Sequence, residues 1–366
     1  MRVGVEVRSL VSPEIRGLTR YTTNLLRGLS DRDDIDLVLF CREALHPAHL
    51  DGIDAEIIAG TKDREALWYD RWLAGEIRNA NLDVFHAPAD RGLPIRGSCP
   101  KVVTIHSSFE RRHWRQLFPT LKQRLWYWRH EYANRTADAI VTVSETTRRE
   151  LIEAGYDDER IHAIHLAAAL PFSDVPEDGD ASVLATLEVQ QPYFLCVSGY
   201  NDHKNLDVLV EAFAATSLRG HELVIVADHR WNFELHRSRW SRLEAFERIR
   251  LIETGDAEIA VLYRHCVACV NPSRWESFGL QLVEAMACGA PVISSNAHAL
   301  PEVAADAAMY FDPDSPDQLS QLMRIAAHDK DRLEAVRTAG RHRRQKFSWS
   351  ETVRRTVGVY QRVIAH

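Results

Sequence analysis

Short apolar runs alternate with helix-like segments along this chain, and the alternation occurs in two series. Strands are expected first at residues 3–7, 36–40, 83–86, 101–106 and 139–143, and then at 193–198, 222–227, 250–252, 267–271, 291–294 and 308–311. Helices are expected between them, among others at 19–29, 64–79, 145–154, 206–215 and 256–265. A strand–helix–strand series predicts a parallel sheet. The Pro- and Asp-containing residues 171–180 are predicted to link the two series.

Two Rossmann-like, doubly wound α/β domains facing a central cleft are therefore predicted. The first is expected to cover residues 1–172 and the second 181–346. A chain of 366 residues is too long for one compact core, and it suits two domains of ordinary size. Ligands of such sheets bind beyond the carboxyl ends of the strands, so candidate residues are expected there.

Composition narrows the class of protein further. The net charge of −7 argues against general nucleic-acid binding, and no apolar run is long enough to cross a bilayer. The start, M-R-V-G-V-E-V, resembles a strand instead of a signal peptide, which predicts a cytoplasmic location. Six cysteines lie scattered in apolar segments. Cys266 and Cys269 form one C-x-x-C without a second pair, so no zinc site is expected.

Residues 276–284, E-S-F-G-L-Q-L-V-E, place two carboxylates eight positions apart around a Phe-Gly-Leu turn. If a loop ends at Gly279 and a helix begins near Leu280, Glu276 precedes a helix N-terminus and Glu284 lies on its second turn. The free N–H groups of such a terminus attract anions, above all phosphates. Glu276 can then face a polar group beyond the phosphate, and Glu284 can accept hydrogen bonds from a ribose. A nucleotide diphosphate sugar meets both conditions; an ordinary amphipathic helix with two surface glutamates is the alternative.

The next residues, A-M-A-C-G-A-P-V-I-S-S, indicate a helix that ends at Gly289 and a short strand after Pro291. The whole segment 271–293 resembles the donor-binding signature of the retaining glycosyltransferases of family 4, which have the GT-B fold. The likeness extends over the whole chain. It implies that the amides of Phe278, Gly279 and Leu280, next to Ser277, hold the diphosphate of the donor, that Glu276 contacts the sugar, and that the closing segment 347–360 packs back on the first domain, as a helix over about 349–366.

Residues 197–206, V-S-G-Y-N-D-H-K-N-L, contain the end of a strand and a polar loop with a lysine. The strand is expected to end at Gly199, and Lys204 then lies in the polar loop before the next helix. A lysine there can neutralise a leaving diphosphate, as the resemblance also implies. The family often has arginine where this chain has His203. A solvated lysine near a helix start is the alternative.

Two candidates come from the first domain. His106 ends the strand K-V-V-T-I-H, and the resemblance implies a contact with the donor sugar. The family commonly has aspartate next, where this chain has Ser107. Gly17, in E-I-R-G-L-T-R-Y, resembles the glycine loop of the family and permits close backbone approach to the diphosphate or the sugar. A purely structural histidine and loop glycine are the alternatives.

Residues 110–135 interleave Arg and Lys with Trp, Tyr and Phe and contain few acids. This pattern is typical of a surface that meets anionic lipid, or a lipid-diphosphate acceptor, at the inner face of the cytoplasmic membrane. The alternative is one long helix that packs its aromatic side chains inward and solvates its arginines.

Together the resemblance implies transfer of a hexose, with retention, from a GDP- or UDP-sugar to a glycan or a lipid-linked saccharide in polysaccharide or O-antigen-type biosynthesis. Mannose from GDP-mannose is the first hypothesis. No D-x-D element lies at a strand end, so no metal ion and no cofactor beyond the nucleotide-sugar co-substrate is expected. The alternatives are a nucleotide-sugar epimerase or hydrolase of the same fold and a protein that binds without catalysis.

Overall fold

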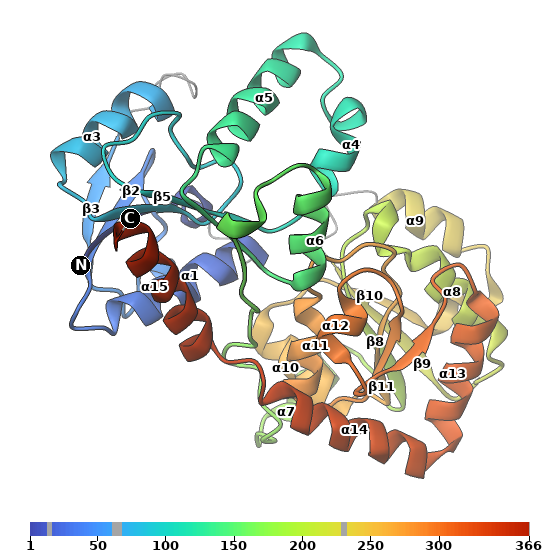
Figure 1. The fold of residues 1–366 in the computed structure, drawn as a ribbon. Coiled ribbons are helices and arrows are strands. Elements are labelled where there is room, and N and C mark those ends of the chain that lie inside the picture. Colours follow the sequence, from blue (N-terminus) through green and yellow to red (C-terminus); the bar gives the residue numbers. More distant parts are fainter. Residues whose placement is uncertain (13–16, 61–67, 228–232, 366) are drawn as a thin grey trace. The chain divides into compact units, whose positions relative to one another are not determined.

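The computed structural model describes residues 1–12, 17–60, 68–227 and 233–365, and it divides into two compact units (Figure 1). One unit comprises residues 1–166 and 349–366, and the other residues 167–348. The domain bounds taken from the sequence, 1–172 and 181–346 with a returning helix at about 349–366, remain a proposal beside this division. None of the described helices is long and apolar enough to cross a membrane.

The first unit contains a seven-stranded sheet in the order β3-β2-β1-β4-β5-β6-β7, with every neighbouring pair parallel. Its strands are β1 (Arg2–Glu6), β2 (Asp36–Cys41), β3 (Glu56–Ala59), β4 (Val84–Ala87), β5 (Lys101–Ile105), β6 (Ala139–Thr142) and β7 (Ile161–Ala163). Its α-helices are α1 (Gly17–Ser30), α3 (Ala74–Asn79), α4 (Phe109–Leu117), α5 (Leu121–Arg135), α6 (Glu145–Glu153) and α15 (Trp349–Ala365). Strands β4, β5 and β6 are buried throughout and β1 is buried from Val3 onward, as expected for parallel strands covered by helices.

The second unit contains a six-stranded parallel sheet in the order β10-β9-β8-β11-β12-β13. Its strands are β8 (Tyr193–Val197), β9 (Glu222–Val226), β10 (Ile249–Ile252), β11 (Ala268–Asn271), β12 (Val292–Ser295) and β13 (Met309–Phe311). Its helices are α7 (Asp180–Thr186), α8 (Leu206–Ala215), α9 (Phe233–Trp240), α10 (Asp256–His265), α11 (Leu280–Ala287), α12 (Leu300–Ala304), α13 (Pro316–His328) and α14 (Lys330–Arg344). The prediction of two doubly wound parallel sheets is confirmed.

Within the first unit, helix α15 is joined to the sheet and to α1 by a buried chain of polar side chains. The His86 ring bonds through Nδ1 to the Tyr360 hydroxyl at 2.6 Å and through Nε2 to Thr104 Oγ1 at 2.8 Å, and Thr104 Oγ1 lies 2.9 Å from the Tyr21 hydroxyl. All four side chains are at most 2% exposed. Burial therefore lowers the pKa of His86 from 6.5 to about 3, and the ring is neutral at neutral pH.

Some predicted elements differ from the observed ones. The single long helix considered for residues 110–135 is wrong, because α4 ends at Leu117 and α5 begins at Leu121. Pro119 has no N–H to donate, and the Thr120 side chain forms a capping box with Gln123 that starts a new helix. The helix expected at 64–79 lies partly outside the described residues; its remainder forms a π-helix at Trp68–Leu73 followed by α3.

Candidate functional site

Two loops of the second unit follow adjacent strands at the centre of the sheet. Strand β8 lies between β9 and β11, and the chain proceeds from β8 to one side of the sheet and from β11 to the other. The loops after β8 and β11 therefore begin at a topological switch point, which is where ligands bind in open α/β sheets. The first loop carries Lys204 in a short 3₁₀ turn, Asp202–Lys204, and the second carries Glu276.

The Glu276 carboxylate receives three donors on one oxygen. Lys204 Nζ lies 2.7 Å from Oε1, the Ser273 hydroxyl 2.9 Å and Gln281 Nε2 2.8 Å. The Glu276 side chain is 11% exposed and that of Lys204 is 20% exposed, so the pair is largely shielded from water. Burial alone would raise the pKa of Glu276, but the charge of Lys204 and the three hydrogen bonds lower it below its usual value. Glu276 is therefore ionised at neutral pH.

Asn205 fastens the two loops together. It has a left-handed backbone with φ 59°, and its side-chain amide donates to the carbonyl oxygens of Pro272 at 3.0 Å and Pro313 at 2.8 Å. The Arg274 backbone N–H donates to the His203 carbonyl at 2.7 Å, and the Arg274 guanidinium donates to Asn205 Oδ1. Lys204 and Glu276 thus meet because their loops are joined through both backbone and side chains.

The turn before α11 has the geometry of an anion-binding helix start. Gly279 has φ +88°, and a Cβ there would lie 2.6 Å from Leu300 Cδ2, so both conformation and space require glycine. No side chain of the described residues caps the N-terminus of α11, which leaves its first N–H groups available to a ligand. Phe278 is buried against Phe347, with ring centroids 5.8 Å apart, and it holds the turn in place.

The remaining candidates of this unit lie in the same two segments. Leu280 is the first residue of α11 and Ser277 is half-buried, whereas Glu284, on the second turn of α11, is only 2% exposed. Gly199 follows β8, and among the described residues a Cβ there would come within 4 Å of Asn201 Nδ2 alone, at 3.8 Å. Burial, and then the charge of Lys204, lowers the pKa of His203, so its ring is neutral near pH 7.

His106 and Gly17 belong to the other unit. His106 follows β5, and its Nε2 lies 2.9 Å from the Pro88 carbonyl oxygen. Because a carbonyl only accepts, Nε2 carries the hydrogen; burial lowers the pKa of His106, so Nδ1 is left as an acceptor. The Tyr21 ring meets the His106 ring edge-on at 4.7 Å. Gly17 is the exposed first residue of α1, and residues 14–16 of its loop lie outside the described residues.

The structure brings together Lys204, Glu276 and the turn at Gly279, and their role as a diphosphate site stays a prediction. Sequence reasoning missed Asn205, Ser273 and Gln281. All three lie inside segments that it quoted, but their hydrogen bonds to Glu276 or to the Pro carbonyls could not be read from spacing alone. The described residues contain no group of three or more His, Cys, Asp or Glu side chains placed to bind a metal ion.

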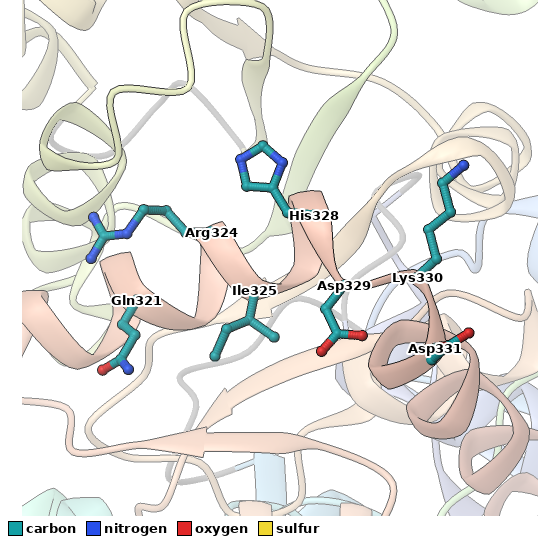
Figure 2. Close-up of a pocket in the computed structure, with 7 residues that line it drawn as sticks. All are labelled: Gln321, Arg324, Ile325, His328, Asp329, Lys330 and Asp331. Carbon is teal, nitrogen blue, oxygen red and sulfur yellow. The ribbon is translucent and has the colours of Figure 1, made fainter.

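A depression of about 650 Å³ lies elsewhere, at the junction of α13 and α14 (Figure 2). It is lined by Gln321, Arg324, Ile325, His328, Asp329, Lys330 and Asp331. Figure 2 shows that these side chains point in different directions and do not converge on one point. None of the predicted site residues is among them.

Two known protein families together match most of the chain. Residues 185–343 match the family described as Glycosyl transferases group 1, and residues 15–168 match the family described as Glycosyltransferase Family 4. The chain belongs to the family 4 glycosyltransferases. The resemblance stated from residues 271–293 is therefore confirmed. This segment runs from the last residue of β11 through the loop with Glu276 and α11 to the first residues of β12.

Individual relatives agree with this assignment. O-antigen chain mannosyltransferase B of Escherichia coli is 30% identical over 239 residues, which cover 62% of this chain and 61% of that protein. The serotype-specific mannosyltransferase WbdA of Escherichia coli is 27% identical over 239 residues, covering 62% of this chain and 29% of that protein. The match thus spans less than two thirds of both relatives. The structure of HepE of Anabaena in complex with UDP aligns with a TM-score of 0.79 at 17% identity, over 98% of this chain and 99% of that chain, so the GT-B fold is shared.

Proposed function

We propose that this protein transfers a hexose, with retention of configuration, from a nucleotide diphosphate sugar to a hydroxyl group of a glycan or a lipid-linked saccharide. The observation that carries the proposal is the convergence of Lys204, Glu276 and the uncapped N-terminus of α11 at the switch point of the second sheet. Positive charge and free N–H groups suit a diphosphate, and an ionised carboxylate beside them suits the hydroxyl groups of a sugar.

Each group has a defined part in this proposal. The amides of Phe278, Gly279 and Leu280 and the ammonium of Lys204 hold the two phosphates, with Gly199, His203 and Ser277 beside them. Glu276 accepts hydrogen bonds from the sugar through Oε2, to which no described residue donates. Glu284 accepts hydrogen bonds from the ribose.

The residues of the first unit form a separate part of the proposal. His106 offers Nδ1 to a sugar hydroxyl, since Nε2 is already bound to Pro88. Gly17 permits backbone approach to the donor. Neither role depends on the Lys204–Glu276 pair, so each is tested by its own variant, His106→Asn and Gly17→Val, in the same assays.

The chemical step balances without an added reactant. The bond between the anomeric carbon and the leaving phosphate oxygen breaks, and the bond to the acceptor oxygen forms on the same face. The acceptor hydroxyl gives its proton to the leaving diphosphate. Positive charge from Lys204 and the N–H groups of α11 stabilise the diphosphate as negative charge builds on it, which is where electrostatic catalysis is most effective.

The donor is proposed to be GDP-mannose, because the two Escherichia coli relatives are mannosyltransferases. A UDP-sugar is the alternative, since the HepE structure holds UDP. A panel of GDP-, UDP- and ADP-sugars in a thermal shift assay separates them, because a ligand at 100 times its Kd stabilises by about 2.7 kcal/mol. Stabilisation by none of them would refute the proposal.

Two variants test the assignment of roles. Glu284→Ala is expected to weaken donor binding, and Glu276→Ala to slow transfer more than it weakens binding. Glu211→Ala, on the exposed face of α8, is the matched control and should change neither. Unchanged affinity and turnover in both site variants would remove these roles. Turnover of the donor without an acceptor would instead indicate the epimerase or hydrolase alternative.

A further inference from the structure

A pocket of about 380 Å³ in the first unit is lined by residues of α6, β7 and α15. Its apolar lining residues are all buried: Ile161, Ala163, Ile164 and Val359. Its polar lining residues carry four guanidinium groups, one imidazole and one carboxylate: Arg148, Arg354, Arg355, Arg362, His162 and Glu145. None of these residues is a candidate for the donor site. The pocket is therefore a separate feature with an excess of positive charge, in a chain whose net charge is −7.

Two of the four arginines lack an acidic partner. Arg148 and Arg354 each form ion pairs with carboxylates of the first unit. Within the part of the chain that the structure describes, no carboxylate forms an ion pair with Arg355 or Arg362. The Arg362 Nε donates to the Gly358 carbonyl oxygen of its own helix, at 3.2 Å. The guanidinium groups of Arg355 and Arg362 therefore retain donors and an uncompensated charge for an anionic ligand.

The positive charge of the pocket acts on His162, in the middle of β7. Burial, and then the charges of Arg362, Arg355 and Arg148, lower the pKa of His162, so its ring is neutral near pH 7. β7 is the edge strand of the described sheet, and an edge strand has backbone N–H groups without a strand partner. Planar guanidinium groups and free N–H groups are the donors that phosphate oxygens accept from most readily.

Gly358 leaves room for such a ligand. It lies within α15, where a Cβ would meet no described atom of a neighbouring element within 4 Å. Glycine is unfavourable inside a helix, and any larger side chain there would enter the space that the arginines surround. The open space at Gly358 and the charge of Arg355 and Arg362 are thus independent features of the same pocket.

We propose that this pocket binds the phosphate group of a small, soluble phosphate monoester, with Arg355 and Arg362 donating to its oxygens. The two uncompensated guanidinium groups match the two negative charges of a monoester near neutral pH. A bilayer is a poor occupant, because every apolar side chain that lines the pocket is buried and cannot insert. A symmetric contact with a second copy would bring like charges together. The proposal does not rest on the nature of the donor or on transfer itself.

Isothermal titration of the full-length protein with glycerol 3-phosphate, at pH 7.5, constant ionic strength and without any donor, tests this. Wild type should bind one equivalent with a Kd of about 1 mM or lower, and should bind dimethyl phosphate, which has one charge, about tenfold more weakly or worse.

Three variants locate the binding. Arg355→Gln with Arg362→Gln should raise the Kd by about tenfold or more. Arg27→Gln with Arg149→Gln is the matched control, because both side chains are exposed in the same unit, lie outside the pocket and carry the same total charge; it should bind like wild type. Gly358→Leu keeps all four arginines but fills the space, and should weaken binding as strongly as the first pair.

Each other outcome overturns the proposal for a stated reason. Circular dichroism melting first shows that each variant is folded. Wild type without saturable binding excludes the site, and a charge or Gly358 variant that binds like wild type places the ligand elsewhere. Equal weakening in the control pair indicates a general charge effect. Binding that Lys204→Met abolishes places the probe at the donor site instead. Nucleotide-sugar thermal shifts should be unchanged in the Arg355 and Arg362 variant, so failure of the donor assignment and failure of this proposal are distinguishable.

Discussion

Replacing Lys204 by methionine should destabilise the second unit and weaken donor binding, because both depend on the positive charge of the lysine. Lys204 Nζ lies 2.7 Å from Glu276 Oε1, and the Glu276 side chain is only 11% exposed. At an effective dielectric constant of about 20, opposite charges at this distance attract by about 6 kcal/mol before desolvation is subtracted. Removing one partner of a fully buried pair costs about 3 to 5 kcal/mol, so this largely shielded pair should cost about 2 to 3 kcal/mol.

The same substitution should also weaken donor binding by an amount that can be worked out separately. A hydrogen bond to a charged group contributes about 1.5 to 3 kcal/mol, so loss of the Lys204 ammonium should raise the Kd of the donor by about 10- to 150-fold. Urea unfolding at neutral pH measures the first effect, and isothermal titration with the donor that gives the largest thermal shift measures the second.

The double variant Lys204→Met with Glu276→Gln separates the two effects. With no carboxylate left uncompensated, and with Ser273 and Gln281 still able to donate to the amide oxygen, more than half of the lost stability should return. Donor affinity should not return, because the phosphates still lack the ammonium. A single variant as stable as wild type, or a double variant that recovers donor affinity together with stability, would refute the reasoning.

Two further variants address the turn and the buried network. Gly279→Ala should destabilise by about 2 to 4 kcal/mol, from the positive φ and the 2.6 Å approach to Leu300, and should abolish donor-induced thermal shifts. Gly75→Ala, where a Cβ meets no atom of the described residues within 4 Å, should not destabilise, and equal losses in both variants would contradict the argument. For His86 the folded pKa is depressed from 6.5 to about 3, so the unfolded state takes up the proton first and stability falls as the pH drops below about 6.5. Between pH 7 and pH 5 this proton uptake should lower the free energy of unfolding of the wild type by about 2 kcal/mol, as measured by urea unfolding. His86→Gln should not show this loss. A variant that loses as much stability as the wild type over this pH range would exclude His86 as the cause.

Local sequence patterns were sufficient to predict many of the helices and strands. Helix α1 and the buried strands near the centre of each sheet follow from periodicity, and the Gly279–Leu280 boundary of α11 from glycine and helix signals. The break between α4 and α5 was also visible in Pro119 and Thr120, but the continuous run of basic and aromatic residues obscured it. Strands β3 and β7 were missed, since edge strands of four and three residues carry little periodic pattern; β3 is mostly exposed.

The sequence alone determined the α/β class, the two parallel sheets and the glycosyltransferase family, because strand, turn and helix-start signals act over a few residues. Only the tertiary structure decided which donors surround Glu276. Lys204 is 72 positions away from it, and the two meet because β8 and β11 become neighbours and Asn205 ties their loops together. The same holds for His86 and Tyr360, 274 positions apart. Such pairs depend on strand order and loop closure across the whole sheet, which no local pattern specifies.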